Sequence, residues 1–187
     1  WSVAMYFRFV IGDYFIGRQE KILYLDADIV CKGDIRGLAE ADLMDCVAGA
    51  VAERDAAWWA IRADSLDCPA LAQGYFNSGV LLIDIRRWQS EHVSGKAMEM
   101  LSDSAITRRL SYMDQDILNM ILLGKVRFLD GKYNTQFSLN YELKPRFVSP
   151  ITTETVLIHY VGPTKPWHAW ACYPSAQPFM AAKAASP

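Results

Sequence analysis

The chain alternates between short apolar runs and longer amphipathic stretches. Consecutive apolar residues predict buried strands at residues 22–25, 46–52, 80–85, 126–129 and 156–160. Apolar residues at intervals of three or four predict helices at residues 6–15, 35–41, 90–103 and 114–123. Strands that alternate with helices indicate an α/β fold with a mixed, mostly parallel central sheet.

The remaining segments have no clear period. Residues 53–69 mix polar and apolar residues without a regular period, so we expect a mobile loop or a short helix there. Residues 133–150 are expected to be irregular. Ser2 is a candidate cap for the first helix. Residues 1–187 suit one domain, and we expect a frayed tail from about residue 175 to its end.

Composition narrows the function classes. Of the 187 residues, 52% are apolar, which is enough for a sizeable core, and the net charge of −2 argues against general nucleic-acid binding. No apolar run approaches the length of a membrane span. The cysteines form no CxxC pair, which argues against structural zinc and fits reduced thiols; they are Cys31, Cys46, Cys68 and Cys172.

Two carboxylates follow the first predicted strand. Asp26 and Asp28 lie at or just past the end of the apolar run 22–25. Ligands of open α/β sheets bind at the carboxyl ends of strands, and hard cations such as Mg²⁺ and Mn²⁺ prefer oxygen ligands. The pair therefore indicates a cation site, although a strand end that reaches solvent would look the same.

A second group of polar residues follows the last predicted strand. His159 lies near its end, and Gly162 and Lys165 follow in a Gly-Pro turn. Glycine allows a close backbone approach and a lysine ammonium suits a phosphate, so this stretch fits a diphosphate site. The alternative for His159 is a hydrogen-bonded core histidine.

Two further motifs carry amide and carboxylate side chains. Asn77-Ser78-Gly79 precedes the third strand, and Asp114-Gln115-Asp116 opens a helix. An amide can both donate to and accept from sugar hydroxyls. The simpler alternatives are an ordinary turn for the first motif and favourable helix-dipole contacts for the second.

The order of these motifs resembles one family. LYLDAD, FNSGV, DQDILN and HYVGPTKPW occur in the order found in the retaining glycosyltransferases of family 8, which have the GT-A fold, a Rossmann-like nucleotide-diphospho-sugar transferase fold. The resemblance covers about residues 6–174 and is strongest to the bacterial lipopolysaccharide galactosyl- and glucosyltransferases. It implies a hexosyltransferase that uses a UDP-hexose donor and a lipopolysaccharide or oligosaccharide acceptor.

The resemblance also implies roles for the motif residues. Asp26, Asp28 and His159 would ligate Mn²⁺ or Mg²⁺, while Gly162 and Lys165 would contact the donor diphosphate. Gln115 would lie near the anomeric carbon, opposite the leaving group, with Asp114 as the second catalytic candidate. The donor sugar and phosphate would contact Arg8, Asn77, Ser78, Gly79, Asp114 and Asp116.

The sequence departs from the family pattern in two places. It opens inside an apolar stretch, so we expect a fragment that lacks the family's N-terminal strand with its uracil- and ribose-binding residues. A bare edge is then expected along Ile22–Leu25 or Val47–Val51, beside an exposed apolar patch. For a further family aspartate after the second strand, Glu53 and Asp55 are the candidates.

Two other functions fit parts of the pattern. A phosphatase of the haloacid dehalogenase type also places a DxD motif after an apolar strand, but it would leave the His159 stretch without a role. A non-catalytic sugar-nucleotide-binding remnant is the other alternative. The family resemblance implies a cytoplasmic location with possible peripheral contact at the inner membrane face, for which the candidate contacts are Trp167, Trp170, Tyr173 and Phe179.

Overall fold

The computed structural model describes residues 3–186, so the predicted cap Ser2 lies outside the described residues. Its chain divides into two compact parts. The first unit comprises Trp1–Tyr24 and Ala39–Leu129, and the second comprises Leu25–Leu38 and Asp130–Pro187. Each unit has its own sheet and its own hydrophobic cluster, so the one domain expected from the sequence has two compact parts.

A four-stranded sheet forms the centre of the first unit. Its order is β1 (Lys21–Leu25), β4 (Phe76–Asp84), β3 (Ala48–Ala52) and β5 (Val126–Phe128). The β3–β4 pair is antiparallel and the β3–β5 pair is parallel. The α/β class is confirmed, but the sheet is mixed and not mostly parallel as the sequence analysis expected.

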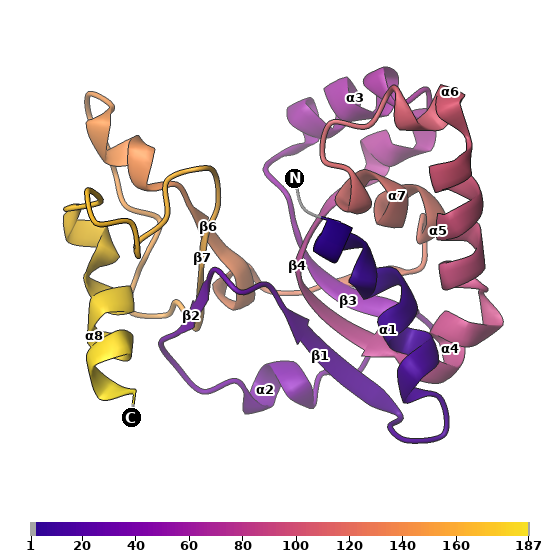
Figure 1. Cartoon of the computed structure of the whole chain (residues 1–187), viewed down its shortest axis with the longest axis horizontal. Helices are drawn as coiled ribbons and strands as arrows, with labels where there is room; N and C mark the ends of the chain where they lie inside the picture. Colours follow the sequence, from indigo (N-terminus) through magenta and orange to yellow (C-terminus); the bar gives the residue numbers. More distant parts are fainter. Residues whose placement is uncertain (1–2, 187) are drawn as a thin grey trace. The chain divides into compact units, whose positions relative to one another are not determined.

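Helices pack beside this sheet and on one another: α1 (Phe7–Phe15) contacts α4 (Ile85–Ser90) and α5 (Val93–Ser102), and α5 contacts α7 (Asp114–Ile121) (Figure 1). The buried side chains of Trp88, Phe9 and Ile117 join the strands in one core. Gly12 lies directly against the Trp88 ring, where an added Cβ would come within 2.3 Å of Trp88 Cδ1. The other helical segments of this unit are η1 (Val3–Tyr6), α3 (Ala56–Ser65), η2 (Pro69–Gln73) and α6 (Ser104–Thr107).

The edge expected along the first strand is present. Among the described strands, β1 has β4 as its single neighbour, whereas β3 is paired on both sides. Nearby helix α1 exposes large apolar side chains at Phe7, Val10 and Tyr14. The bare edge is therefore confirmed for Ile22–Leu25 and wrong for Val47–Val51, while the size of the apolar patch stays a prediction.

The second unit has a smaller sheet of order β2 (Ile29–Cys31), β7 (Leu157–Tyr160) and β6 (Thr135–Phe137). The β2–β7 pair is antiparallel and the β6–β7 pair is parallel. Phe137, Ile158 and Tyr160 form the centre of its core. Its helical segments are α2 (Arg36–Ala39), η3 (Gly131–Asn134), η4 (Leu139–Leu143), η5 (Pro174–Ala176) and α8 (Gln177–Ala185).

Two local predictions were wrong. Residues 177–185 form helix α8 and are not a frayed tail, because Pro178 suits a first helical turn and alanine is the strongest helix former. The Asn77-Ser78-Gly79 motif lies inside β4 and not in a turn before it. No helix among residues 3–186 combines the length and the apolar character needed to cross a membrane.

Candidate functional site

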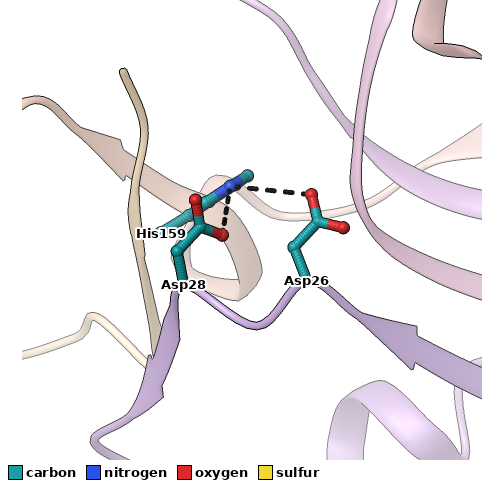
Figure 2. Close-up of side chains that lie close together, drawn as sticks. All are labelled: Asp26, Asp28 and His159. Carbon is teal, nitrogen blue, oxygen red and sulfur yellow. Dashed lines mark ion pairs between the residues drawn. The ribbon is translucent and has the colours of Figure 1, made fainter. Parts of the chain in front are cut away.

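The DxD carboxylates and His159 come together within the second unit. Asp26 and Asp28 lie in the turn between β1 and β2, and Ile29 of β2 pairs with His159 of β7. The backbone amide of Tyr160 also donates to the carbonyl of Asp28 at 3.0 Å. This pairing places both carboxylates beside the imidazole, although Asp28 and His159 are 131 positions apart in the chain (Figure 2).

The three side chains have the spacing of metal ligands. One ligand atom from each residue lies within 4.8 Å of the other two. His159 Nε2 is 3.2 Å from Asp28 Oδ1 and 3.9 Å from Asp26 Oδ2. The predicted convergence is therefore confirmed, and a carboxylate–carboxylate–imidazole set suits a divalent cation.

Asn134 fixes the orientation of the His159 ring. Its amide oxygen lies 3.0 Å from His159 Nδ1 in a buried contact. Because that oxygen can only accept, the proton of the neutral ring lies on Nδ1 and Nε2 keeps its lone pair. Asp28 Oδ1, which faces Nε2, is buried without a hydrogen-bond donor among the described residues. Two lone pairs that face each other inside the protein fit a shared cation.

Lys165 occupies the other oxygen of Asp28. Its ammonium lies 2.5 Å from Asp28 Oδ2 and donates to the carbonyl of Tyr160 at 2.6 Å. Burial alone would raise the pKa of Asp28, but His159, when its ring is protonated, and Lys165 outweigh it and lower this pKa to about 2. Asp28 is therefore ionised at neutral pH, as a metal ligand must be.

Gly162 shapes the turn between His159 and Lys165. Its φ of 86° lies in the left-handed region, and an added Cβ would come within 3.2 Å of Ser138 Oγ. The turn therefore requires glycine, and Gly162 itself is exposed.

A separate polar cluster is buried within the first unit. Arg8 Nε lies 2.8 Å from Asp114 Oδ2, and Arg8 Nη1 donates to both the carbonyl and the hydroxyl of Ser78. The Arg8 guanidinium also lies 4.7 Å from the centroid of the Tyr24 ring. These contacts join α1, β1, β4 and α7 around one arginine.

A β-bulge in β4 connects this cluster to Gln115. The register with β3 shifts between Ala50, which pairs with Leu81, and Val51, which pairs with Asn77. The amide of Ser78, inside this shift, donates to Gln115 Oε1 at 3.0 Å. Bulges free backbone groups from the ladder, and here the freed group orients the Gln115 amide.

Glu53 extends the cluster through Asn77. Asn77 Nδ2 donates to Glu53 Oε2 at 2.8 Å, and Asn77 Oδ1 accepts from the amide of Gly79. Asp55, the other candidate, caps α3 by accepting from the amide of Trp58. The two acidic candidates thus have different positions: Glu53 joins the polar cluster, and Asp55 is a helix cap.

The predicted substrate contact of Asp116 is wrong in this structure. Its side chain is 0% exposed, and its carboxylate accepts four hydrogen bonds from protein groups. In this structure no oxygen of this carboxylate faces solvent, and both oxygens are bonded to protein donors.

The comparisons agree with the resemblance of the motifs. A family model described as glycosyl transferase family 8 matches residues 1–171. The chain belongs to this family. It is 50% identical over 188 residues to the lipopolysaccharide 1,3-galactosyltransferase of Salmonella typhimurium. It is 53% identical over 189 residues to the lipopolysaccharide glucosyltransferase WaaO of Escherichia coli. Each match covers 100% of this chain and 56% of the relative's length.

Solved structures of the family show the same fold. The galactosyltransferase LgtC, solved with donor and acceptor sugar analogues, has a TM-score of 0.79 at 28% identity, covering 97% of this chain and 66% of that chain. The glycosyltransferase GlyE of Streptococcus pneumoniae has a TM-score of 0.72 at 27% identity, covering 94% of this chain and 41% of that chain. The GT-A fold expected from the motifs is therefore confirmed for this family 8 chain.

Proposed function

We propose that this family 8 chain carries the catalytic region of a retaining hexosyltransferase, which moves galactose or glucose from a UDP-sugar to a saccharide acceptor of the lipopolysaccharide core. The observation that carries this proposal is the convergence of Asp26, Asp28 and His159 beside Lys165. The similarity to lipopolysaccharide galactosyl- and glucosyltransferases supports the choice of sugar and acceptor.

Asp26, Asp28 and His159 would hold Mn²⁺ or Mg²⁺. When bound, such an ion supplies positive charge that stabilises the negative charge developing on the departing diphosphate. Lys165 would leave Asp28 and bind the same diphosphate, and the Gly162 turn would offer its exposed backbone to it. The 2.5 Å distance between the Lys165 ammonium and Asp28 Oδ2 supports the role of Lys165, because it places the ammonium beside the proposed metal ligand.

The polar cluster of the first unit would bind the donor sugar. Asn77, Ser78, Gly79 and Asp114 offer amide, hydroxyl, backbone and carboxylate groups for sugar hydroxyls, and Arg8 would reach the donor sugar and phosphate. Their buried contacts with one another hold them in fixed orientations. We predict that Asn77, Asp114 and Gln115 line one sugar-binding surface of the first unit when donor is bound.

Gln115 would lie beside the anomeric carbon. An amide is a poor nucleophile, so we favour attack of the acceptor hydroxyl on the face that the diphosphate leaves, through an oxocarbenium-like transition state. The bond from the anomeric carbon to the diphosphate oxygen breaks, the bond to the acceptor oxygen forms, and the hydroxyl proton passes to the departing diphosphate. Gln115 Oε1 would stabilise the positive charge on the sugar.

Transfer assays test this proposal directly. The full-length protein that contains this chain is incubated with Mn²⁺, UDP-galactose or UDP-glucose, and lipopolysaccharide core oligosaccharides, and products are followed by mass spectrometry. We expect a product larger by one hexose, lost in Asp28→Asn and retained in Lys183→Ala, since Lys183 is exposed on α8. UDP binding without any transfer would instead support the non-catalytic alternative. Phosphate release from simple phosphoesters would support the phosphatase alternative.

We also propose a cytoplasmic location with peripheral contact at the inner membrane face. The support is the exposure of Trp167 and Trp170 in the second unit, because tryptophan favours membrane interfaces. Co-sedimentation with vesicles that contain lipopolysaccharide tests it: binding should weaken in Trp167→Ala/Trp170→Ala. Equal binding of this variant, or no binding by the parent chain, would contradict the proposal.

A further inference from the structure

Asp116 is the most completely satisfied carboxylate described above. Its Oδ1 accepts from Arg62 Nη2 at 2.7 Å and from the Tyr75 hydroxyl at 2.5 Å. Its Oδ2 accepts from the backbone amides of Ser111 and Tyr112 at 2.8 and 2.7 Å. Burial and the charge of Asp116 raise the pKa of Tyr75, so its hydroxyl keeps the proton that it donates.

The two backbone donors belong to the turn that leads into α7. The next residue, Met113, has φ 45° and ψ −109°, a conformation that side chains other than glycine rarely adopt. Such strained residues persist only where surrounding contacts hold them. The backbone amide of Gln115 donates to the Tyr112 carbonyl at 2.9 Å. The turn therefore also fixes the position of Gln115 in the first turn of α7.

Arg62, on α3, holds the same turn from its other side. Its Nη1 donates to Ser111 Oγ at 3.3 Å and to Ser65 Oγ at 2.8 Å, and its guanidinium lies 5.3 Å from the centroid of the Tyr112 ring. Arg62 is 6% exposed and was not singled out by any sequence motif. One buried guanidinium thus reaches Asp116 and both ends of the backbone that Asp116 binds.

We propose that Arg62 and Asp116 form a positioning pair, which holds the strained turn 111–113 and thereby orients Asp114 and Gln115 for sugar transfer. The pair touches no substrate and acts through the turn. The catalytic part of this inference rests on the proposed function, whereas the structural part does not.

The test combines hydrogen exchange with kinetics. Arg62→Met removes the guanidinium and its charge. Arg62→Lys keeps a buried cation opposite Asp116 but has no second nitrogen to reach Ser111. Arg109→Met is the matched control, because Arg109 forms an exposed ion pair with Asp67 at 2.9 Å.

Amide exchange should report the turn even if the chain proves inactive. We expect exchange at Ser111, Tyr112 and Gln115 to accelerate more than about tenfold in both Arg62 variants, with the β4 amides and the Arg109 control unchanged. If Arg62→Met fails to fold, the exchange rates of Arg62→Lys alone test the proposal. Unchanged exchange at these amides in a folded Arg62 variant would overturn the proposal.

Kinetics separate positioning from simple loss of stability. If the wild-type chain is active, kcat should be about 100-fold lower in Arg62→Lys, measured at a temperature where this variant is fully folded. The Mn²⁺ affinity of the variant should stay unchanged. A kcat equal to that of the Arg109 control would overturn the positioning role. Inactivity of the wild-type chain would contradict the proposed function alone, and the exchange result would still decide the structural part.

Discussion

Lys165 Nζ lies 2.5 Å from Asp28 Oδ2, so the cation expected at the diphosphate is paired with an expected metal ligand. His159 contacts the other oxygen of the same carboxylate. The ammonium therefore supplies positive charge at a site that also suits a metal ion. Metal binding and the position of Lys165 must then depend on each other.

Replacing Lys165 by Met should have opposite effects on two ligands. Without the neighbouring ammonium, we expect Mn²⁺ alone to bind about tenfold more tightly, since the like charge beside the Asp28 carboxylate is removed. UDP in the presence of Mn²⁺ should bind more weakly. Calorimetric titrations of both ligands measure this, with Lys183→Met as the control; equal Mn²⁺ affinity in all three chains would show that Lys165 does not compete.

Asn134 should control metal affinity without being a ligand. Asn134→Leu removes the acceptor of the His159 Nδ1 hydrogen, so the ring loses its orientation and Mn²⁺ affinity should fall by about 10- to 100-fold. Asn134→Asp keeps an acceptor and should keep most of the affinity. Electron paramagnetic resonance of free Mn²⁺ gives the affinities, and a folded Asn134→Leu chain with normal affinity would refute the orientation argument.

The turn at Gly162 should not tolerate a side chain. Gly162→Ala places a Cβ at a φ of 86° and against Ser138 Oγ, so the free energy of unfolding should fall by about 1–2 kcal/mol. Gly17→Ala is the matched control, because Gly17 has a φ of 71° with no atom near its added Cβ. Urea unfolding should show the larger loss for Gly162→Ala, and the two losses should become similar when Ser138→Ala is added. Equal losses from the start would exclude the Ser138 contact.

Glu53 and Asp55 should separate into a site residue and a helix cap. Asp55→Ala should lower the free energy of unfolding by about 1 kcal/mol and leave kcat unchanged, because it removes the cap of α3. Glu53→Ala should lower kcat for sugar transfer, because it removes the partner that orients Asn77. Denaturation curves and transfer rates of both variants test these two roles. A loss of kcat in Asp55→Ala together with an unchanged kcat in Glu53→Ala would contradict the assignment.

The sequence predicted the parts of the fold that have strong local patterns. The apolar runs that became β1, β3, β4, β5 and β7 and the amphipathic period of α7 are such patterns. Strands β2 and β6 were missed because Ile29–Cys31 directly follows the DxD turn and Thr135–Phe137 contains no apolar run. The sequence indicated Asp26, Asp28 and His159 because each lies in a recognisable local motif. The structure shows that these three side chains lie close together.

The supporting contacts had no sequence signal. Asn134 meets His159 across 25 positions, Asn77 meets Glu53 across 24, and Arg62 meets Asp116 across 54. Each of these pairs depends on how distant segments pack, which no local pattern reports. Asp116 was misassigned for the same reason, since its burial depends on α3 and on the turn before α7.

The central claim is that Asp26, Asp28 and His159 hold one divalent cation used in sugar transfer. Titration of Mn²⁺ in the presence of UDP, followed by paramagnetic resonance, tests it most directly. We predict one tight Mn²⁺ per chain, displaced by excess Mg²⁺ and lost in a folded Asp26→Asn/Asp28→Asn variant. Tight binding that survives in this variant, or no binding by the parent chain, would contradict the claim.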